Sequence, residues 1–363
     1  MHSIDRIRAV LAGKPVDRLP VQPMLMMFAA KHAGQLFVDY ARDGRKLAEA
    51  QLKVAADYGI DCLLAGSDPA REVVDIAGPD SVLWTDSGPT IDEDHPALAD
   101  KRRLASLETP DPLSGGRMTD QIKSIEIMRE FAGPGASVVG WVEGPLALAQ
   151  ELRGLSNLML DFQDDPGFVT DLLTFAAEVA VRNWEPQVEA GADTIGMGDA
   201  AASLIGPVLY EKFVLPAQMH VVTAIRGTRP GVIVRLHMCG RTDPLLPAMQ
   251  RLPVDIFELD FPVDLVRARE VLGDDRTILG NVSTVGVMLS GTPEQVYEAA
   301  AACHRACGGH FIVGTGCEVS PDTPPDNLRA IVAYAREHGA DPEAGPAAPI
   351  AGGSLASRSE PDL

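Results

Sequence analysis

Two cysteines and one histidine occupy positions from which their side chains could bind one metal ion. His237 and Cys239 lie two residues apart in the apolar run GVIVRLHMCG, and Cys317 closes a later run, HFIVGTGC. Side chains two residues apart in a β-strand point to the same face of the sheet, so His237 and Cys239 project together. Two thiolates and one imidazole select Zn²⁺, and three protein ligands leave a fourth position free for chemistry. The sequence therefore predicts a catalytic zinc site that activates a thiol or a similar nucleophile.

The other three cysteines are predicted to be packing residues. Cys303 and Cys307 have the spacing of a helical pair, but they lie in AAAACHRACGG, which has the pattern of an outer helix. Cys62 falls within an apolar run that is typical of a core strand. Five cysteines are an odd number, and the chain begins without a secretory pattern, so a disulfide framework is not expected.

Eight short apolar runs alternate with longer helical patterns along the chain. Most of the runs are nearly continuous in apolar residues, as parallel strands covered on both faces should be. Proline and glycine delimit helices at 165–191, 292–309 and 323–339, and Thr292 and Gln295 are spaced as a capping box. Eight strands separated by helices predict an α/β fold, a (β/α)₈ TIM barrel with an N-terminal helical extension. The eight runs are 19–27, 60–66, 136–144, 193–199, 231–240, 254–261, 276–283 and 310–317.

The chain is predicted to hold one domain and a tail. We expect residues 1–340 to form a single TIM-barrel domain, in which residues 1–59 include an N-terminal helical layer and the first strand. A long insertion is expected around residues 67–135. Residues 341–363 are rich in Ala, Gly, Pro and Ser without periodicity, so disorder is predicted there. The competing architecture is a doubly wound nucleotide-binding sheet, which is disfavoured because GMGD and GTGC lack the GxGxxG spacing.

Composition limits the partners that this chain can have. With 31 basic and 51 acidic residues the net charge is −20, which opposes binding to nucleic acid or to an anionic membrane surface. A hydrophobic content of 46% allows a large core, but no stretch reaches the roughly 18 apolar residues of a membrane span. We therefore expect a cytoplasmic protein that contacts neither nucleic acid nor membrane.

Polar side chains close several of the apolar runs, at the end where TIM barrels carry their function. Burying an ionised carboxylate without a partner is costly, so a metal and a polar substrate would explain these residues together. Glu143 and Asp199 are predicted to be catalytic, as proton acceptors or as groups that orient a zinc ligand, and Glu143 is also placed to complete the zinc shell itself. The simpler alternative for each is a carboxylate that caps a neighbouring helix. Asp68, Asp260 and Asn281 are predicted to bind the substrate, although Asp68 is also placed to cap a turn.

Segments that surround these residues resemble the uroporphyrinogen decarboxylase superfamily, and the resemblance covers residues 3–340. They are DRIRAVLAGKPVDRLPVQPM, GADTIGMGDAAASLIGPVLYEKFVLP, LHMCGRT and GTGCEVSPDTPPDNLRAIVAYAREHG. More narrowly, the chain is similar to the zinc-dependent methylcobamide:coenzyme M methyltransferase branch. That resemblance implies a (β/α)₈ barrel in which His237, Cys239 and Cys317 hold the zinc. The decarboxylase branch fits less well, because its arginine-containing RQAGR motif is replaced here by MMFAAKHAGQ, with Lys31 as the charged side chain.

The resemblance also implies a reaction and its partners. A methyl group would pass from a methylated corrinoid (methylcobalamin) to a zinc-activated thiol similar to coenzyme M, or to a tetrahydrofolate acceptor. The chain has no Asp-x-His-x-x-Gly corrinoid-binding motif, so the corrinoid is expected on a separate partner protein. The alternative is a first-step methyltransferase that moves methyl from a small methylated compound to the corrinoid protein. Uroporphyrinogen decarboxylation and a non-catalytic module that binds zinc or a corrinoid protein are the remaining alternatives.

Overall fold

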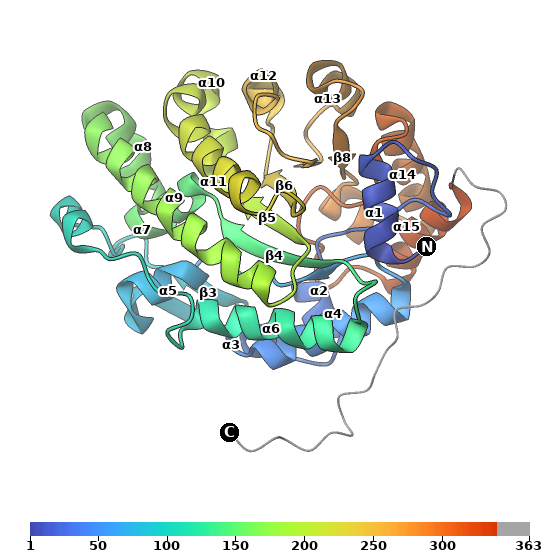
Figure 1. Cartoon of the computed structure of the whole chain (residues 1–363), viewed down its shortest axis with the longest axis horizontal. Helices are drawn as coiled ribbons and strands as arrows, with labels where there is room; N and C mark the ends of the chain where they lie inside the picture. The colour runs from blue at the N-terminus through green and yellow to red at the C-terminus, as the bar shows by residue number, and fades with distance from the viewer. Residues whose placement is uncertain (340–363) are drawn as a thin grey trace.

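The centre of the molecule is a curved sheet of seven parallel strands surrounded by helices (Figure 1). The computed structural model describes residues 1–339, so the tail predicted to be disordered lies outside the described residues. The strand order is β1-β4-β5-β6-β7-β8-β9, so neighbours in the sheet follow one another along the chain. The strands are β1 (Leu63–Leu64), β4 (Val138–Glu143), β5 (Thr194–Gly198), β6 (Ile233–Met238), β7 (Ile256–Leu259), β8 (Thr277–Leu279) and β9 (Phe311–Ile312).

An eighth extended segment closes the sheet into a barrel. Val21 forms a parallel bridge with Val313, just after β9, and on its other side its carbonyl accepts from the Asp61 N–H at 2.8 Å. The first apolar run therefore lies between β9 and β1. All eight predicted runs occupy barrel positions, and the prediction of a (β/α)₈ barrel with an N-terminal helical extension is confirmed.

Helices connect and cover the strands. The predicted capping box is present at the start of α14, and the predicted proline-led starts of α9 and α15 are also found. Cys62, Cys303 and Cys307 are buried, as expected of packing residues. The helices are α1 (Ser3–Leu11), α2 (Met27–His32), α3 (Phe37–Arg42), α4 (Gly44–Tyr58), α5 (Arg71–Ala77), α6 (Arg117–Ala132), α7 (Pro145–Arg153), α8 (Leu155–Asp164), α9 (Pro166–Glu189), α10 (Gly206–Leu209), α11 (Leu215–Thr228), α12 (Leu246–Met249), α13 (Leu265–Leu272), α14 (Pro293–Cys307) and α15 (Pro325–Glu337). Short 3₁₀ turns are η1 (Pro79–Ser81), η2 (Lys101–Ser106), η3 (Ala200–Leu204) and η5 (Asp243–Leu245), and π turns are η4 (Tyr210–Val214) and η6 (Thr284–Leu289).

The segment predicted as an insertion contains both added and regular elements. Helix α5 and an antiparallel hairpin, β2 (Val82–Thr85) with β3 (Gly88–Ile91), follow β1. Helix α6 then packs against α4 and leads into β4, as the outer helix of a barrel does. The added part is therefore shorter than the 67–135 range, because α6 belongs to the barrel.

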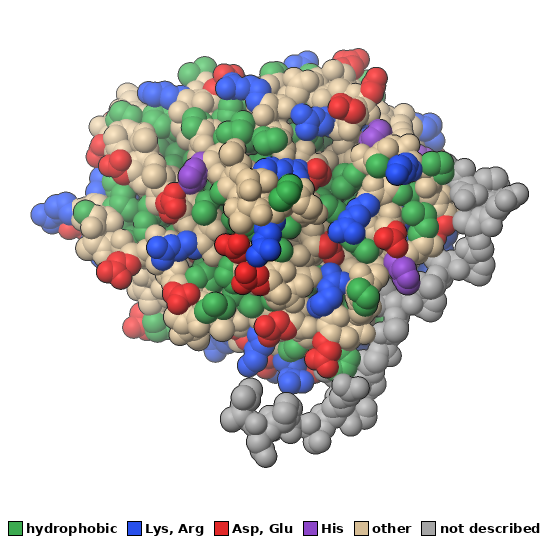
Figure 2. All heavy atoms as spheres, in the orientation of Figure 1, with side chains coloured by type: hydrophobic (Ala, Val, Ile, Leu, Met, Phe, Trp, Pro, Cys, Tyr) green, Lys and Arg blue, Asp and Glu red, His purple; other side chains and the backbone are tan. Residues whose placement is uncertain are grey.

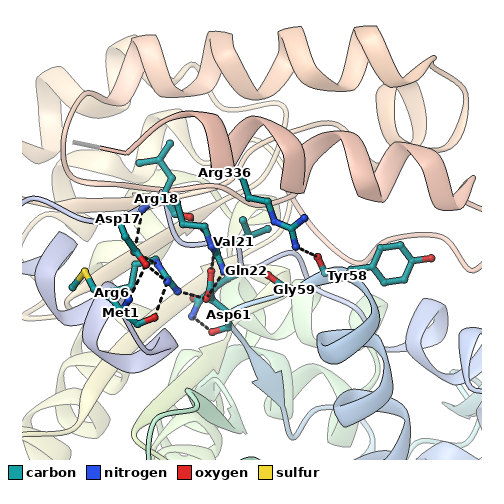
Figure 3. Close-up of polar contacts among 11 residues, drawn as sticks. Met1, Arg6, Asp17, Arg18, Val21, Gln22, Tyr58, Gly59, Asp61 and Arg336 are labelled. Atoms are coloured by element: carbon teal, nitrogen blue, oxygen red, sulfur yellow. Dashed lines mark hydrogen bonds and ion pairs between the residues drawn. The ribbon is translucent and has the colours of Figure 1, made fainter. Parts of the chain in front are cut away.

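A buried network of two arginines and two aspartates fixes the closure of the barrel (Figure 3). Arg6 from α1 and Arg18 each donate to the Asp61 carboxylate at 2.6 Å, and Arg6 also binds Asp17 at 2.7 Å. Asp61 additionally accepts from the Val21 N–H at 2.9 Å. Each buried charge has a partner, which is the condition under which such groups are tolerated. The network holds α1, the first extended segment and β1 together.

The surface of the molecule carries charged side chains together with exposed apolar ones such as Leu36 and Val208. Acidic and basic side chains are interspersed over the face that Figure 2 shows. Among residues 1–339, none of the helices combines the length and the apolar character that crossing a membrane requires.

Candidate metal centre

The structure brings together the three side chains that the sequence predicts as metal ligands. His237 is on β6, Cys239 follows that strand directly, and Cys317 follows β9. His237 Nε2 lies 3.1 Å from Cys239 Sγ, which lies 3.4 Å from Cys317 Sγ. One ligand atom from each residue falls within 4.8 Å of the others, and residues 1–339 contain no second group of this kind. A histidine and two cysteines gathered in this way are a ligand set that zinc prefers.

Two glycines beside the thiols let neighbouring loops approach the ligand-bearing segments closely. Gly240, next to Cys239, has a φ of 81°, which favours glycine, and a Cβ there would lie 2.6 Å from Ser203 Oγ. Gly316, next to Cys317, has so little space that a Cβ would collide with the backbone nitrogen of Phe261. The loops that follow β5 and β7 therefore contact the residues beside both thiols.

The three candidate ligands, His237, Cys239 and Cys317 (the triad), differ strongly in the direction of their pKa shifts. The Cys239 thiol and the His237 ring lower the pKa of Cys317 to about 4, against the effect of burial. Burial disfavours the imidazolium, but the Glu258 carboxylate and Cys317 outweigh it and raise the pKa of His237 to about 10. The Cys317 thiolate and burial raise the pKa of Cys239. A divalent cation would therefore displace protons from His237 and Cys239, as metal binding to such ligands requires.

A buried carboxylate contacts the side of His237 that faces away from the thiols. Glu258 on β7 is in register with His237 on β6, and its Oε2 lies 3.3 Å from His237 Nδ1. Arg235 Nε donates to the same oxygen at 2.8 Å, and Arg235 Nη2 pairs with Glu258 Oε1. Burial favours the neutral acid, yet Arg235 and His237 lower the pKa of Glu258 to about 2. The carboxylate faces Nδ1, and Nε2 lies on the side of the thiols, which is the arrangement in which a carboxylate behind a ligand can orient a metal-binding imidazole.

The sequence analysis did not predict the Arg235–Glu258 ion pair, although the alternation of residues along both strands indicates it. In RLHMC, alternate residues share one strand face, so Arg235 points into the barrel with His237 and Cys239. A buried arginine requires an acidic partner. Glu258 precedes Asp260 by two residues in IFELD and has the same alternation. What the pattern leaves open is which carboxylate lies beside His237.

Glu143 ends β4 and belongs to a cluster of buried carboxyl groups. Its Oε1 accepts from Trp141 Nε1 at 3.0 Å, and the centroid of the Trp141 ring system is 6.3 Å from that of His237. The intervening strand presents Gly198 in register with both Glu143 and His237, and the Trp141 ring lies against this glycine. Burial, followed by the carboxyl groups of Glu72 and Glu151, raises the pKa of Glu143 well above its usual range. Burial also raises the pKa of Glu151 to about 7.

Asp199 directly follows β5, and its carboxylate is held by neighbouring structure. It accepts from the Ala147 N–H in the first turn of α7 and from Gln218 Nε2, both at 2.7 Å. Burial raises the pKa of Asp199 to about 6, although these donors oppose the shift. The carboxylate thus caps α7 across the barrel mouth, the simpler of the two roles considered. A catalytic role for Asp199 stays a prediction.

The three predicted substrate-binding residues also lie at strand ends and hold loops. Asp68 pairs with Arg117 at 2.5 Å. Asp260 accepts from the Gly240 and Phe261 N–H groups, both at 2.6 Å, and so fixes the turn beside Cys239. The Asn281 amide donates to the carbonyls of Asp260 at 3.0 Å and Val263 at 2.9 Å. Their contact with a substrate stays a prediction.

Glu318 is a further acidic residue that sequence reasoning did not single out. It follows Cys317 and accepts from the N–H groups of Met26 and Met27, at 3.0 and 2.7 Å. Burial raises the pKa of Glu318 to about 8 despite these donors. The interaction holds the start of α2 against the loop that carries Cys317.

Comparisons with known proteins agree with the fold and show the family. The family model described as uroporphyrinogen decarboxylase (URO-D) matches residues 2–338. The methylcobamide:CoM methyltransferase MtbA of Methanosarcina mazei is 28% identical over 347 residues, covering 92% of this chain and 97% of its own. MtaA of Methanosarcina barkeri, a methylcobamide:CoM methyltransferase, is 26% identical with the same coverage. A solved methyltransferase structure from Methanosarcina mazei shares the fold, with a TM-score of 0.83 at 23% identity over 93% of this chain and 99% of its own. This chain belongs to the uroporphyrinogen decarboxylase family.

Proposed function

We propose that this protein is a cytoplasmic, zinc-dependent methyltransferase. It moves a methyl group from a methylated corrinoid protein to a thiol that resembles coenzyme M, or to a tetrahydrofolate acceptor. The observation that carries the proposal is the clustering of His237, Cys239 and Cys317 within 4.8 Å at the carboxyl end of the barrel. Relatives that align with 92% of the chain and are named methylcobamide:CoM methyltransferases support the same reaction.

Each residue at the site has its own role in such a transfer. A zinc ion held by the triad would offer an open coordination position and lower the pKa of a thiol placed there. Glu258 holds the His237 ring in place, and Glu143 accepts the proton that the acceptor thiol loses. The acceptor sulfur forms the new bond to the methyl carbon, and the carbon–cobalt bond of the donor breaks with its electron pair left on cobalt. The rigid strand ends supply the alignment of the two reactants.

Methyl transfer from free methylcobalamin tests the proposal directly. Zinc-loaded protein is incubated with methylcobalamin and one acceptor at a time. The acceptors are coenzyme M, 2-mercaptoethanol and tetrahydrofolate. The expected result is loss of the methylcobalamin spectrum together with an equal amount of methylated acceptor. Turnover that instead requires a small methylated compound and free cob(I)alamin would favour the first-step reaction. The absence of both activities with zinc bound would reject methyl transfer.

Substitution of Glu143 tests its role as the proton acceptor. We expect Glu143→Gln to retain zinc and to lower kcat by about 100-fold, a typical contribution of acid–base catalysis. Because its pKa is raised, Glu143 is ionised only at higher pH, so wild-type kcat should rise with pH while that of the variant stays flat. Steady-state rates between pH 5.5 and 9 measure this difference.

Asp199→Asn provides the matched comparison. Both Asp199 oxygens already accept structural hydrogen bonds, so this change is expected to lower the free energy of unfolding more than kcat. If Asp199→Asn flattens the pH profile of kcat and Glu143→Gln does not, Asp199 is the proton acceptor and the role proposed for Glu143 is wrong.

A further inference from the structure

The side chain of Trp141 on β4 lies inside the barrel near His237. Strands β4, β5 and β6 are neighbours in the sheet (Figure 1), and Trp141 is in register with Gly196 on β5 and, through it, with Arg235 on β6. A Cβ at Gly196 or at Gly198 would lie 2.4 or 2.5 Å from atoms of the indole ring, so the ring lies directly against these two glycines. The centroid of the ring system is 6.3 Å from that of His237. The indole therefore extends from β4 across β5 towards the candidate ligand on β6.

Part of the Trp141 ring is accessible from the barrel interior. Alternation along β4 places Gly140 against Gln187 of α9 on the outer face, so Trp141 and Glu143 face inwards. Trp141 is the one partly buried residue of β4, whose other residues are buried. The backbone of β4 is paired with a strand on each side, so the exposed area belongs to the side chain. The accessible part of the ring can therefore contact a small molecule that is held at the triad.

Three buried glutamates near Trp141 lack a positively charged partner. Glu143 Oε1 accepts from Trp141 Nε1 at 3.0 Å, and no donor among residues 1–339 pairs with Glu143 Oε2. Burial raises the pKa of Glu143, and the charges of Glu72 and Glu151 add to the rise. These three residues, which we call the acidic cluster, are 3%, 7% and 9% exposed, and none forms an ion pair with a basic side chain of the described residues. Buried carboxylates without partners are costly, so a cation placed beside them would be stabilising.

The arginines around the acidic cluster are engaged by other groups. Arg117 pairs with Asp68 at 2.5 Å, and Arg235 pairs with Glu258. Arg71 Nη1 donates to the Arg117 carbonyl at 2.7 Å. These basic side chains therefore do not supply the missing partner.

We propose that the substrate held at the triad carries a positive charge, which lies on the Trp141 ring beside Glu143. This inference rests on the proposed function and narrows its acceptor to a thiol that bears an ammonium group. The face of an indole ring attracts a cation that lies within about 6 Å of its centroid. A short thiol whose sulfur occupies the open position on the metal can reach the ring, because the His237 and Trp141 centroids are 6.3 Å apart. The acidic cluster repels an anionic group, such as a sulfonate, at the same place.

Three thiols that differ only in their terminal group test the charge of the substrate. They are cysteamine, 2-mercaptoethanol and coenzyme M, whose two-carbon chains end in an ammonium, a hydroxyl and a sulfonate group. Titration of the Co²⁺-substituted protein, followed by the absorption of the thiolate–cobalt bond, gives each Kd without turnover. We expect cysteamine to bind at least tenfold more tightly than coenzyme M, equivalent to about 1.4 kcal/mol. The ratio of the variant Kd to the wild-type Kd for each thiol cancels the acidity of the thiol itself.

Trp141→Leu and Trp141→Phe isolate the contribution of the aromatic face. Both changes remove the hydrogen bond to Glu143, but only phenylalanine keeps a ring that attracts a cation. We expect Trp141→Leu to raise the Kd of cysteamine by roughly tenfold and Trp141→Phe to raise it by roughly threefold or less. The Kd of 2-mercaptoethanol and the metal content should stay at wild-type values. Glu151→Gln, which removes one charge of the acidic cluster, should raise the Kd of cysteamine alone.

The outcomes separate this inference from the proposed function. If coenzyme M binds as tightly as cysteamine, or if Trp141→Leu raises all three Kd values equally, the charge assignment is overturned while methyl transfer stands. If cysteamine binds as expected but no thiol accepts a methyl group from methylcobalamin, the charge preference stands and the proposed function falls. A cobalt spectrum that responds to none of the thiols rejects both.

Discussion

Alanine in place of Cys239 is expected to abolish zinc binding and methyl transfer while the barrel stays folded. The change removes one of three ligands. The loss of zinc affinity should therefore exceed the roughly 10–100-fold loss that follows removal of a residue that only orients a ligand. Cys239 is only partly buried and follows the end of β6, so its side chain contributes little to the core. Zinc content after dialysis against a chelator, the rate with methylcobalamin, and circular dichroism measure the three parts of this prediction.

Cys307→Ala separates the loss of a ligand from the loss of a thiol in general. Cys307 is a buried packing residue on α14, so this variant should retain zinc and turnover even if its stability falls. A Cys239→Ala protein with one equivalent of tightly held zinc and normal rates would eliminate the metal centre as described.

Glu258→Gln is expected to lower zinc affinity by about 10–100-fold, because the glutamine amide cannot offer the carboxylate that orients His237. The same change leaves the guanidinium of Arg235, which is 1% exposed, without its anionic partner. Removal of one partner from a buried ion pair typically costs about 3–5 kcal/mol, so the free energy of unfolding should fall by a comparable amount. Competition with a zinc indicator and urea unfolding measure the two effects.

The pH dependence of unfolding gives a second signature of this ion pair. The pKa of Glu258 is about 2 in the folded protein, below its ordinary value of 4.5. Its stabilisation is therefore fully present above pH 4.5 and is lost as the pH falls towards 2. The difference in stability between wild type and Glu258→Gln should shrink over that range.

A double variant distinguishes positioning of His237 from simple support of the fold. Arg235→Leu/Glu258→Leu replaces both charges with apolar groups, which often restores the stability that a single change removes. Zinc affinity should remain low, because no carboxylate faces His237 Nδ1. If the double variant recovers wild-type zinc affinity together with stability, Glu258 supports only the fold.

The sequence by itself determined the architecture. It also determined that two of the three candidate ligands, His237 and Cys239, form a local pair. Strand and helix periodicities arise from backbone geometry within a few residues, so the eight apolar runs and the starts of α9, α14 and α15 could be identified in advance. The strand period likewise placed His237 and Cys239 on one face. The segments that surround the candidate ligands then indicated the family.

Only the tertiary structure decided which distant groups meet. Cys317 is 78 residues from Cys239, and their approach to 3.4 Å depends on how the sheet curves from β6 to β9. The register between β6 and β7 placed Glu258 beside His237. The position of α7 decided that Asp199 would cap a helix. Such contacts depend on the packing of whole elements, because a strand pattern specifies the face of a side chain but not the neighbour that it meets.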